Sequence, residues 1–193
     1  IITGATGMVG EGVLLHCLAS DEVSEILMIN RRPYGLSHPK LKELLISDFN
    51  KMGGHSEGLS AYHGCFYCAG ISSIGMNEAD YTRITYDTTL NFAKVLHSVN
   101  PGMVFNFVTG AHTKTDGPQM WQRVKGRTEV ALMAVGFSGQ YNFRPGFMKP
   151  VKGQKNVRWF FKPVIAVLPY LIPKQTLTLN EVGQAMIHTI TRG

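Results

Sequence analysis

Three glycines with a regular spacing follow a short apolar run at the start of the sequence. Gly4, Gly7 and Gly10 stand between residues 1–3 and a stretch with helical periodicity. At a strand-to-helix junction the first glycine permits a tight turn, the second lets the backbone approach a pyrophosphate, and the third allows helix and strand to pack closely. The helix N-terminus then offers amide groups and its positive dipole end to the phosphates. The spacing therefore predicts a dinucleotide-binding turn that opens a βαβ unit.

Apolar runs of strand length alternate with amphipathic stretches along the chain, which predicts a parallel sheet with helices on both faces. We expect an α/β fold, a doubly wound Rossmann-type sheet, in a single domain over residues 1–193. Asn77 and Thr178 suit helix N-caps. The expected strands are residues 1–3, 25–30, 44–47, 64–68, 103–109 and 140–144, and the expected helices are residues 8–19, 77–98, 119–135 and 179–191.

The most apolar stretch covers residues 159–172 and contains Lys162, Pro163 and Pro169. It is shorter than the roughly 20 residues that a membrane span needs, so we expect no transmembrane helix. A short helix and loop that close a substrate pocket is one interpretation, and a surface-docking patch is the alternative. We expect residues 151–178 to form a small segment on the substrate side.

Charge and cysteine content limit the classes of partner and compartment. The chain has 19 Lys and Arg against 13 Asp and Glu, a formal net charge of +6, and its basic residues are scattered. Scattered charge argues against a nucleic-acid partner and is compatible with an anionic small molecule. Three cysteines are too few for a disulfide framework, which favours a reducing compartment, and we expect the cytoplasm.

Cys65 and Cys68 have the two-residue separation of many redox and zinc motifs. On a strand, however, residues three apart point to opposite faces of the sheet. No second Cys or His pair stands at ligand spacing. The two cysteines are therefore expected to pack in the core, and no metal site is expected.

The end of the second expected strand bears on the choice of cofactor. An acidic residue there would bind the ribose 2′-hydroxyl of NAD, but this chain has Asn30, Arg31 and Arg32. Guanidinium groups pair with a phosphate through forked, charge-assisted hydrogen bonds, so the sequence favours NADP(H), with NAD(H) left open. Arg31 ranks above Arg32 because it directly follows the strand. An exposed basic loop is the alternative.

With Thr6, Met8 and Val9 between its glycines, the turn resembles that of the extended and atypical short-chain dehydrogenases/reductases. The likeness continues along the chain, and residues 124–129 make it most similar to nucleoside-diphosphate-sugar epimerase-like proteins and the Tat-interacting oxidoreductase subgroup. It implies a cofactor turn at Cys68, Ala69 and Gly70, an adenine border at Asp48 and Phe49, and an Arg-Pro-Gly motif at Arg144, Pro145 and Gly146, followed by Phe147. An exposed loop aspartate is the alternative for Asp48.

The resemblance also implies a catalytic set. In that family a Tyr transfers a proton to or from the substrate carbonyl, a Lys four residues later lowers its pKa and binds the nicotinamide ribose, and a Ser orients the carbonyl. Here Lys125 stands at the Lys position, Thr109 at the Ser position and Trp121 at the Tyr position. An indole N–H donates a hydrogen bond but cannot serve as a general acid. His112 is a candidate to face the substrate, with exposed loop polarity as the alternative, and Tyr141 is no obvious replacement.

The leading hypothesis is an NADP-dependent oxidoreductase or epimerase-like enzyme for a small carbonyl or hydroxyl substrate, because the chain has little room for a large substrate domain. A catalytically weak NADP(H)-binding regulator or redox sensor is the alternative, supported by Trp121. A structural or nucleic-acid-binding protein is a third class, and it would require that no dinucleotide binds. The resemblance further implies a homodimer, paired through residues 77–98 and 119–135.

Overall fold

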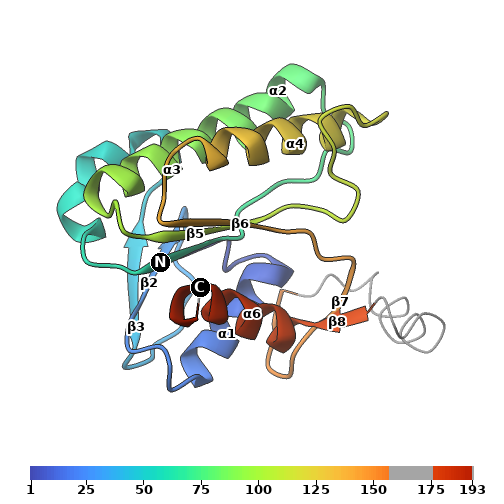
Figure 1. Cartoon of the computed structure of the whole chain (residues 1–193). Helices are drawn as coiled ribbons and strands as arrows, with labels where there is room; N and C mark the ends of the chain where they lie inside the picture. Colours follow the sequence, from blue (N-terminus) through green and yellow to red (C-terminus); the bar gives the residue numbers. More distant parts are fainter. Residues whose placement is uncertain (157–175, 193) are drawn as a thin grey trace.

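Six parallel strands form the central sheet, in the order β3-β2-β1-β4-β5-β6 (Figure 1). The computed structural model describes residues 1–156 and 176–192, so the interpretation of residues 159–172 lies outside the described part. The strand order confirms the predicted doubly wound α/β fold and places β1 beside β4, where the winding direction reverses. The strands are β1 (Ile2–Thr3), β2 (Ile26–Asn30), β3 (Leu41–Leu45), β4 (Gly64–Tyr67), β5 (Val104–Val108) and β6 (Gly139–Phe143).

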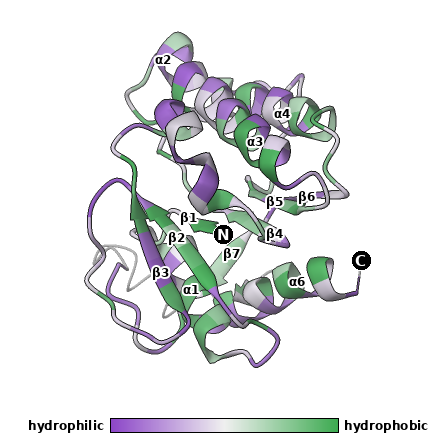
Figure 2. Cartoon of the chain, turned by 90° about the vertical axis from the view of Figure 1, so that its left-hand side faces the viewer, coloured by the Kyte–Doolittle hydropathy of each residue, from purple (hydrophilic) through white to green (hydrophobic). Residues whose placement is uncertain are grey.

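Helices cover both faces of this sheet (Figure 1). One face carries α1 (Met8–Ala19) and α6 (Leu179–Thr191), and the other carries the 3₁₀ segment η1 (Phe49–Leu59), α3 (Thr88–Val99) and α4 (Met120–Met133). All five residues of β2 are buried. Figure 2 shows hydrophobic residues along β2, as a strand covered on both faces requires.

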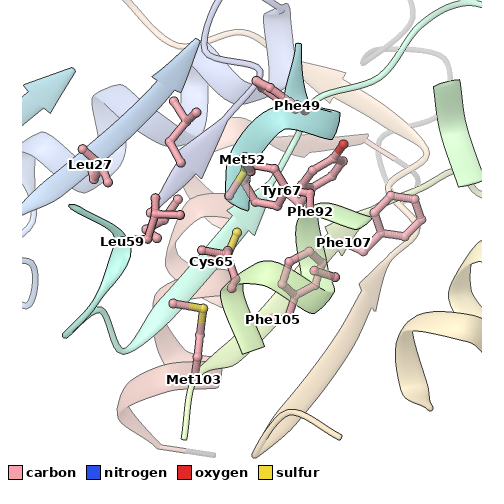
Figure 3. Packing of buried hydrophobic residues seen from close by; sticks show 14 of the residues in the cluster. Leu27, Phe49, Met52, Leu59, Cys65, Tyr67, Phe92, Met103, Phe105 and Phe107 are labelled. Carbon is pink, nitrogen blue, oxygen red and sulfur yellow. The ribbon is translucent and has the colours of Figure 1, made fainter. Parts of the chain in front are cut away.

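Aromatic rings fill the core on the α3 side (Figure 3). The Tyr67 ring centroid lies 5.1 Å from that of Phe92 and 5.9 Å from that of Phe105. Thr89 donates a hydrogen bond to the Tyr67 hydroxyl across 3.2 Å. Full burial of one such ring contributes roughly 1.5–3 kcal/mol, so this cluster fixes the carboxyl ends of β4 and β5.

The third strand begins earlier than the sequence indicated. It spans Leu41–Leu45 instead of residues 44–47, and Leu41 pairs with Ile26 of β2. Because β3 is an edge strand, Lys42 and Glu43 remain exposed. The apolar residues of the sequence therefore indicate only the end of β3, and its start is defined by pairing with β2.

The expected helix over residues 77–98 contains a change of helical geometry. It consists of α2 (Glu78–Thr82), a π-helical turn η2 (Arg83–Asp87) and α3. Asn77 caps its start by accepting a hydrogen bond from the Asp80 amide at 2.8 Å. Turns of π-helix inside α-helices often accompany functional sites, and this turn faces the cleft described below.

A small second sheet pairs β7 (Phe147–Lys149) with β8 (Thr176–Thr178) in parallel. Thr178 then caps α6 through a reciprocal box, in which the Glu181 amide donates to its hydroxyl and Glu181 Oε2 accepts from its amide at 2.6 Å. The parts of the chain described by the structure contain no helix with the length and apolar character of a membrane span.

Candidate functional site

A cleft of about 800 Å³ opens at the carboxyl ends of β1, β2, β4 and β5. In doubly wound sheets ligands bind at this edge, where the winding reverses, and a volume of this size is typical of small-molecule sites. Many of the expected site residues meet here. They are Gly4, Thr6, Gly7, Met8, Val9, Gly10, Arg31, Asp48, Phe49, Cys68, Ala69, Gly70, Thr109 and Lys125.

The glycine-rich turn is held tightly against the end of β4. Gly4 adopts a φ of 71°, a left-handed conformation that L side chains rarely adopt. The Gly7 amide donates to the Gly4 carbonyl at 2.9 Å. A Cβ atom at Gly10 would lie 2.2 Å from that same carbonyl oxygen, so helix α1 can approach the turn only with glycine there. The amide of Ala69, which follows β4, donates to Thr3 Oγ1 at 3.2 Å and joins that segment to the end of β1.

The start of α1 has the features that a phosphate group requires. Its N-cap residue is Gly7, and no side chain caps the first turn. A Cβ at Gly7 would meet its nearest neighbour, the Gly4 carbonyl oxygen, only at 3.4 Å, so the space above Gly7 is part of the cleft. Uncapped amides and the helix dipole together attract an anion. A dinucleotide pyrophosphate fits this turn.

The two arginines after β2 differ in position. Arg31 lines the cleft, whereas Arg32 does not, and both are exposed. Within residues 1–156 and 176–192, no hydrogen bond or ion pair of either guanidinium is seen. Asn30 is buried at 3% exposure, and its amide donates to Glu43 Oε1 at 3.2 Å. Arg31 is therefore available to an anionic ligand, whereas the Asn30 side chain links the end of β2 to Glu43 of β3.

Asp48 and Phe49 border the cleft from the start of η1. The Asp48 carboxylate accepts the Asn50 amide at 3.0 Å and thereby caps η1. The Phe49 ring lies in the aromatic core, with its centroid 5.3 Å from that of Phe92 (Figure 3). Among the described residues that line the cleft, Asp48 is the one acid, and the cations are Arg31, Arg83 and Lys125.

Two of the three expected catalytic positions reach the cleft. Thr109 is 7% exposed, and its hydroxyl lies 2.8 Å from that of Thr113. Burial lowers the pKa of Lys125, with the nearby Glu129 carboxylate acting in the opposite direction. Trp121 is not among the lining residues. Its indole N–H donates to Gln119, and its ring packs near Gly110, where a Cβ would lie 3.3 Å from a ring carbon.

The expected Arg-Pro-Gly motif lies apart from the cleft. Arg144 and Pro145 line a separate hollow of about 300 Å³ next to α6. Gly146 and Phe147 line neither space. The candidates for a substituted proton donor also lie elsewhere. His112 is exposed in its loop, and Tyr141 is 39% exposed on β6, outside the cleft.

One group of lining residues was absent from the sequence-based set: Tyr67, Tyr81, Arg83, Ile84, Thr85, Thr88 and Thr89. Tyr81, Thr85 and Thr89 are buried and stand four residues apart, so one face of the α2-η2-α3 helix is polar yet inward-facing. In the sequence, the spacing of these hydroxyl groups by four residues was the signal that could have identified this face of the helix as part of the site. Burial raises the pKa of Tyr81, while a hydrogen bond from Thr85 opposes the shift. Arg83 pairs with Asp80 at 3.0 Å.

The cysteine pair lies on opposite faces of the sheet, as a strand requires. Cys65 packs in the core on the α3 side, and Cys68 packs against the cluster on the α1 side. Both are free thiols, and burial raises the pKa of Cys65 to about 12. In the described ranges no group of three or more His, Cys, Asp or Glu side chains is arranged to hold a metal ion.

No family model matches this sequence. The protein is similar to the mitochondrial protein fmp52 of Emericella nidulans, with 26% identity over 157 residues, which is 76% of this chain and 65% of fmp52. The matched part is thus about two thirds of the length of that relative.

Solved structures share the fold at low sequence identity. The dTDP-glucose 4,6-dehydratase DesIV of Streptomyces venezuelae, with NAD bound, has a TM-score of 0.73 at 12% identity, over 100% of this chain and 71% of DesIV. A short chain dehydrogenase of Burkholderia cenocepacia in complex with NADP has a TM-score of 0.66 at 13% identity, over 100% of this chain and 83% of that chain. The protein therefore has the doubly wound α/β fold that DesIV and the Burkholderia dehydrogenase also have, and its sequence is similar to that of fmp52.

Proposed function

We propose that this protein binds NADP(H) and acts as an oxidoreductase or epimerase-like enzyme on a small carbonyl or hydroxyl compound. The observation that carries the proposal is the uncapped glycine turn at the sheet's reversal point, next to Arg31, whose guanidinium forms no hydrogen bond or ion pair with the described residues. Such a turn binds a pyrophosphate through backbone amides. In the part of the chain that the structure describes, the cleft is lined by Arg31, Arg83 and Lys125 against one acid, Asp48, which favours an anionic ligand.

The preference for NADP(H) rests on the end of β2. An acidic side chain at this place would repel a 2′-phosphate, and the chain has Asn30 followed by Arg31. DesIV holds NAD and the Burkholderia dehydrogenase holds NADP, so proteins with this fold use either cofactor. The exposed guanidinium of Arg31 supports the phosphorylated form.

Two side chains are assigned roles toward the reacting groups. Lys125 holds the ribose hydroxyls of the nicotinamide nucleotide, and Thr109 donates a hydrogen bond to the substrate oxygen. The Thr113 hydroxyl, 2.8 Å from that of Thr109, fixes the orientation of the donor. A bound nicotinamide supplies or accepts the hydride. Trp121 provides no acidic proton, so turnover on carbonyl compounds should be slow.

Calorimetric titration of the purified protein with NADPH and NADH tests the binding half of the proposal. Consumption of NADPH with a panel of dicarbonyls and quinones tests the catalytic half. Tighter binding of NADPH together with substrate-dependent oxidation is the expected result. Absence of affinity for either dinucleotide would overturn the proposal.

A cofactor-responsive regulator is the second candidate. Its support is Trp121, which stands at the proton-donor position of the resembled family and whose indole N–H is occupied by Gln119. Binding of NADPH without turnover of any carbonyl in the panel would favour this candidate over the enzyme.

We further propose a reducing compartment such as the cytoplasm, and a homodimer. The three free cysteines support the first, although fmp52 bears a mitochondrial name. Val130 and Met133, which are 58% and 66% exposed on α4, support pairing through that helix. Light scattering of Met133→Asp beside the unmodified protein tests the pairing, and a monomer in both samples would refute it.

A further inference from the structure

Glu11 is a buried carboxylate in the first turn of α1, directly after the glycine motif. Glu11 is 0% exposed, and a buried carboxylate requires hydrogen-bond donors. Three donors meet it. The Tyr34 hydroxyl donates to Oε1 at 2.7 Å, the Lys155 amide donates to Oε1 at 2.8 Å, and the Asn156 amide donates to Oε2 at 2.7 Å.

The amide donors belong to residues 151–156, which we call the strap. The strap also contacts the same end of α1 through Gln154, whose side-chain N–H donates to the Met8 carbonyl at 2.7 Å. The side-chain oxygen of Gln154 accepts a hydrogen bond from the Val151 amide at 2.7 Å, so the same side chain also forms a contact within the strap. The strap therefore lies on the first turns of α1, next to the phosphate-binding turn.

The hydroxyl donor belongs to the loop that carries Arg31. Tyr34 stands three residues after Arg31, and its amide donates to Glu43 Oε1 at 2.9 Å. Asn30 donates to the same Glu43 oxygen at 3.2 Å. The loop between β2 and β3 is thus tied to the sheet edge by Glu43 and to helix α1 by Glu11. Burial, with the Glu11 contact, raises the pKa of Tyr34, so its hydroxyl remains a donor at neutral pH.

We infer that Glu11 is a positioning residue that couples the Arg31 loop to the strap, so that binding of the 2′-phosphate and ordering of the strap stabilise each other. The inference rests on the proposed NADP(H) binding. A ligand that immobilises Arg31 also immobilises Tyr34, and through the shared carboxylate it holds the strap amides. Coupling of this kind is reciprocal, so an ordered strap strengthens binding of the phosphorylated dinucleotide.

Replacement by glutamine tests the carboxylate with little change in shape. An amide offers one oxygen and one NH₂ group, and here both carboxylate oxygens accept hydrogen bonds. In Glu11→Gln one donor must therefore face another donor, whichever way the amide turns. Tyr34→Phe removes only the loop contact and leaves the two strap contacts intact. Glu57→Gln, at an exposed position in η1, is the matched control for loss of a carboxylate.

Two measurements separate the outcomes: hydrogen exchange at the Lys155 and Asn156 amides, and affinity for NADPH and NADH by calorimetry. In the unmodified protein, NADPH should slow exchange at these amides more than NADH does. Tyr34→Phe should keep the strap protected in the free protein, remove the extra slowing by NADPH, and weaken NADPH relative to NADH about three- to tenfold. Glu11→Gln should lose strap protection and the same selectivity, and Glu57→Gln should change neither.

An unchanged ratio of NADPH to NADH affinity in Tyr34→Phe would overturn the inference, even if Glu11→Gln failed to fold. Unchanged strap protection in folded Glu11→Gln would also overturn it. Failure of the proposed function looks different, because the unmodified protein would then bind neither dinucleotide while its strap amides remained protected.

Discussion

The Arg144 guanidinium forms a forked pair with the Glu129 carboxylate, which joins the end of β6 to α4. Arg144 Nε donates to Oε1 at 3.1 Å, and a terminal nitrogen donates to Oε2. The Glu129 side chain is 4% exposed, whereas that of Arg144 is 49% exposed. Arg144 therefore neutralises a buried carboxylate one helical turn from Lys125, and it holds this position outside the cleft.

Arg144→Ala should destabilise the fold by leaving the Glu129 carboxylate buried without its partner. Loss of one member of a fully buried pair costs roughly 3–5 kcal/mol, and because Arg144 is half exposed we expect about 2–3 kcal/mol. Urea unfolding measures the loss. Arg127→Ala is the control, since its 3.1 Å pair with Glu78 is exposed and such pairs contribute about 0–1 kcal/mol. Equal losses of unfolding free energy in the two variants would contradict the claim that burial of Glu129 makes its pair with Arg144 the stronger one.

Lys125→Met should stabilise the free protein while weakening the dinucleotide. Burial lowers the folded-state pKa of Lys125 below its usual 10.5, so the unfolded chain binds more protons between the two values. Stability should therefore rise with pH across that alkaline window, and at neutral pH the buried ammonium opposes folding. Unfolding free energies at several pH values should lose this slope in Lys125→Met. Affinity for NADPH should fall about ten- to a hundredfold, as for a charge-assisted contact. A variant that is less stable at neutral pH would refute the burial argument.

Gly7→Val should fold and fail to bind a dinucleotide. A Cβ at Gly7 lies at an ordinary 3.4 Å from the Gly4 oxygen, and the branches would occupy the space above the turn. Gly10→Ala, in contrast, should not fold stably, because its Cβ would lie 2.2 Å from that oxygen. Circular dichroism and calorimetry distinguish the two effects. Undiminished NADPH affinity in folded Gly7→Val would remove the basis of the proposed site.

Arg31→Ala should weaken NADPH and nearly spare NADH. A charge-assisted contact contributes roughly 1.5–3 kcal/mol, which corresponds to about tenfold or more in affinity. The difference should shrink as salt concentration rises. Arg32→Ala is the matched control, since Arg32 is also exposed but does not line the cleft. Equal loss for both cofactors, or equal effects of both substitutions, would show that Arg31 does not contact a 2′-phosphate.

Trp121→Tyr should raise turnover of a reactive dicarbonyl or quinone, because it supplies a phenol at the donor position of the resembled family. A positioned acid contributes about 10²–10⁴-fold, and the gain should be a measurable part of that range. Lys125→Ala should erase the gain. If the unmodified protein already turns over such substrates rapidly and Trp121→Tyr adds nothing, the proton donor lies elsewhere. Tyr81, a buried phenol that lines the cleft, is then the next residue to substitute with Phe.

Local patterns in the sequence were sufficient wherever the structure depends on neighbours along the chain. The helices Met8–Ala19 and Leu179–Thr191 have their expected bounds, because capping and apolar periodicity are local signals. The edge strand β3 was misplaced, since pairing with β2 stabilises its polar start. The π-helical turn was also missed, because a one-residue change in hydrogen-bond register leaves no separate signature in composition.

By itself the sequence determined the α/β class, the strand-turn-helix unit at Gly4, Gly7 and Gly10, and the basic residues after β2, because each depends on residues close together in the chain. Only the tertiary structure decided which of these side chains share one space. It brought Lys125 and Thr109 to the cleft, turned Arg144 toward Glu129, and buried Glu11 under donors more than 140 residues away in sequence. Contacts of that range form when strands and helices pack, and packing depends on the geometry of the whole sheet.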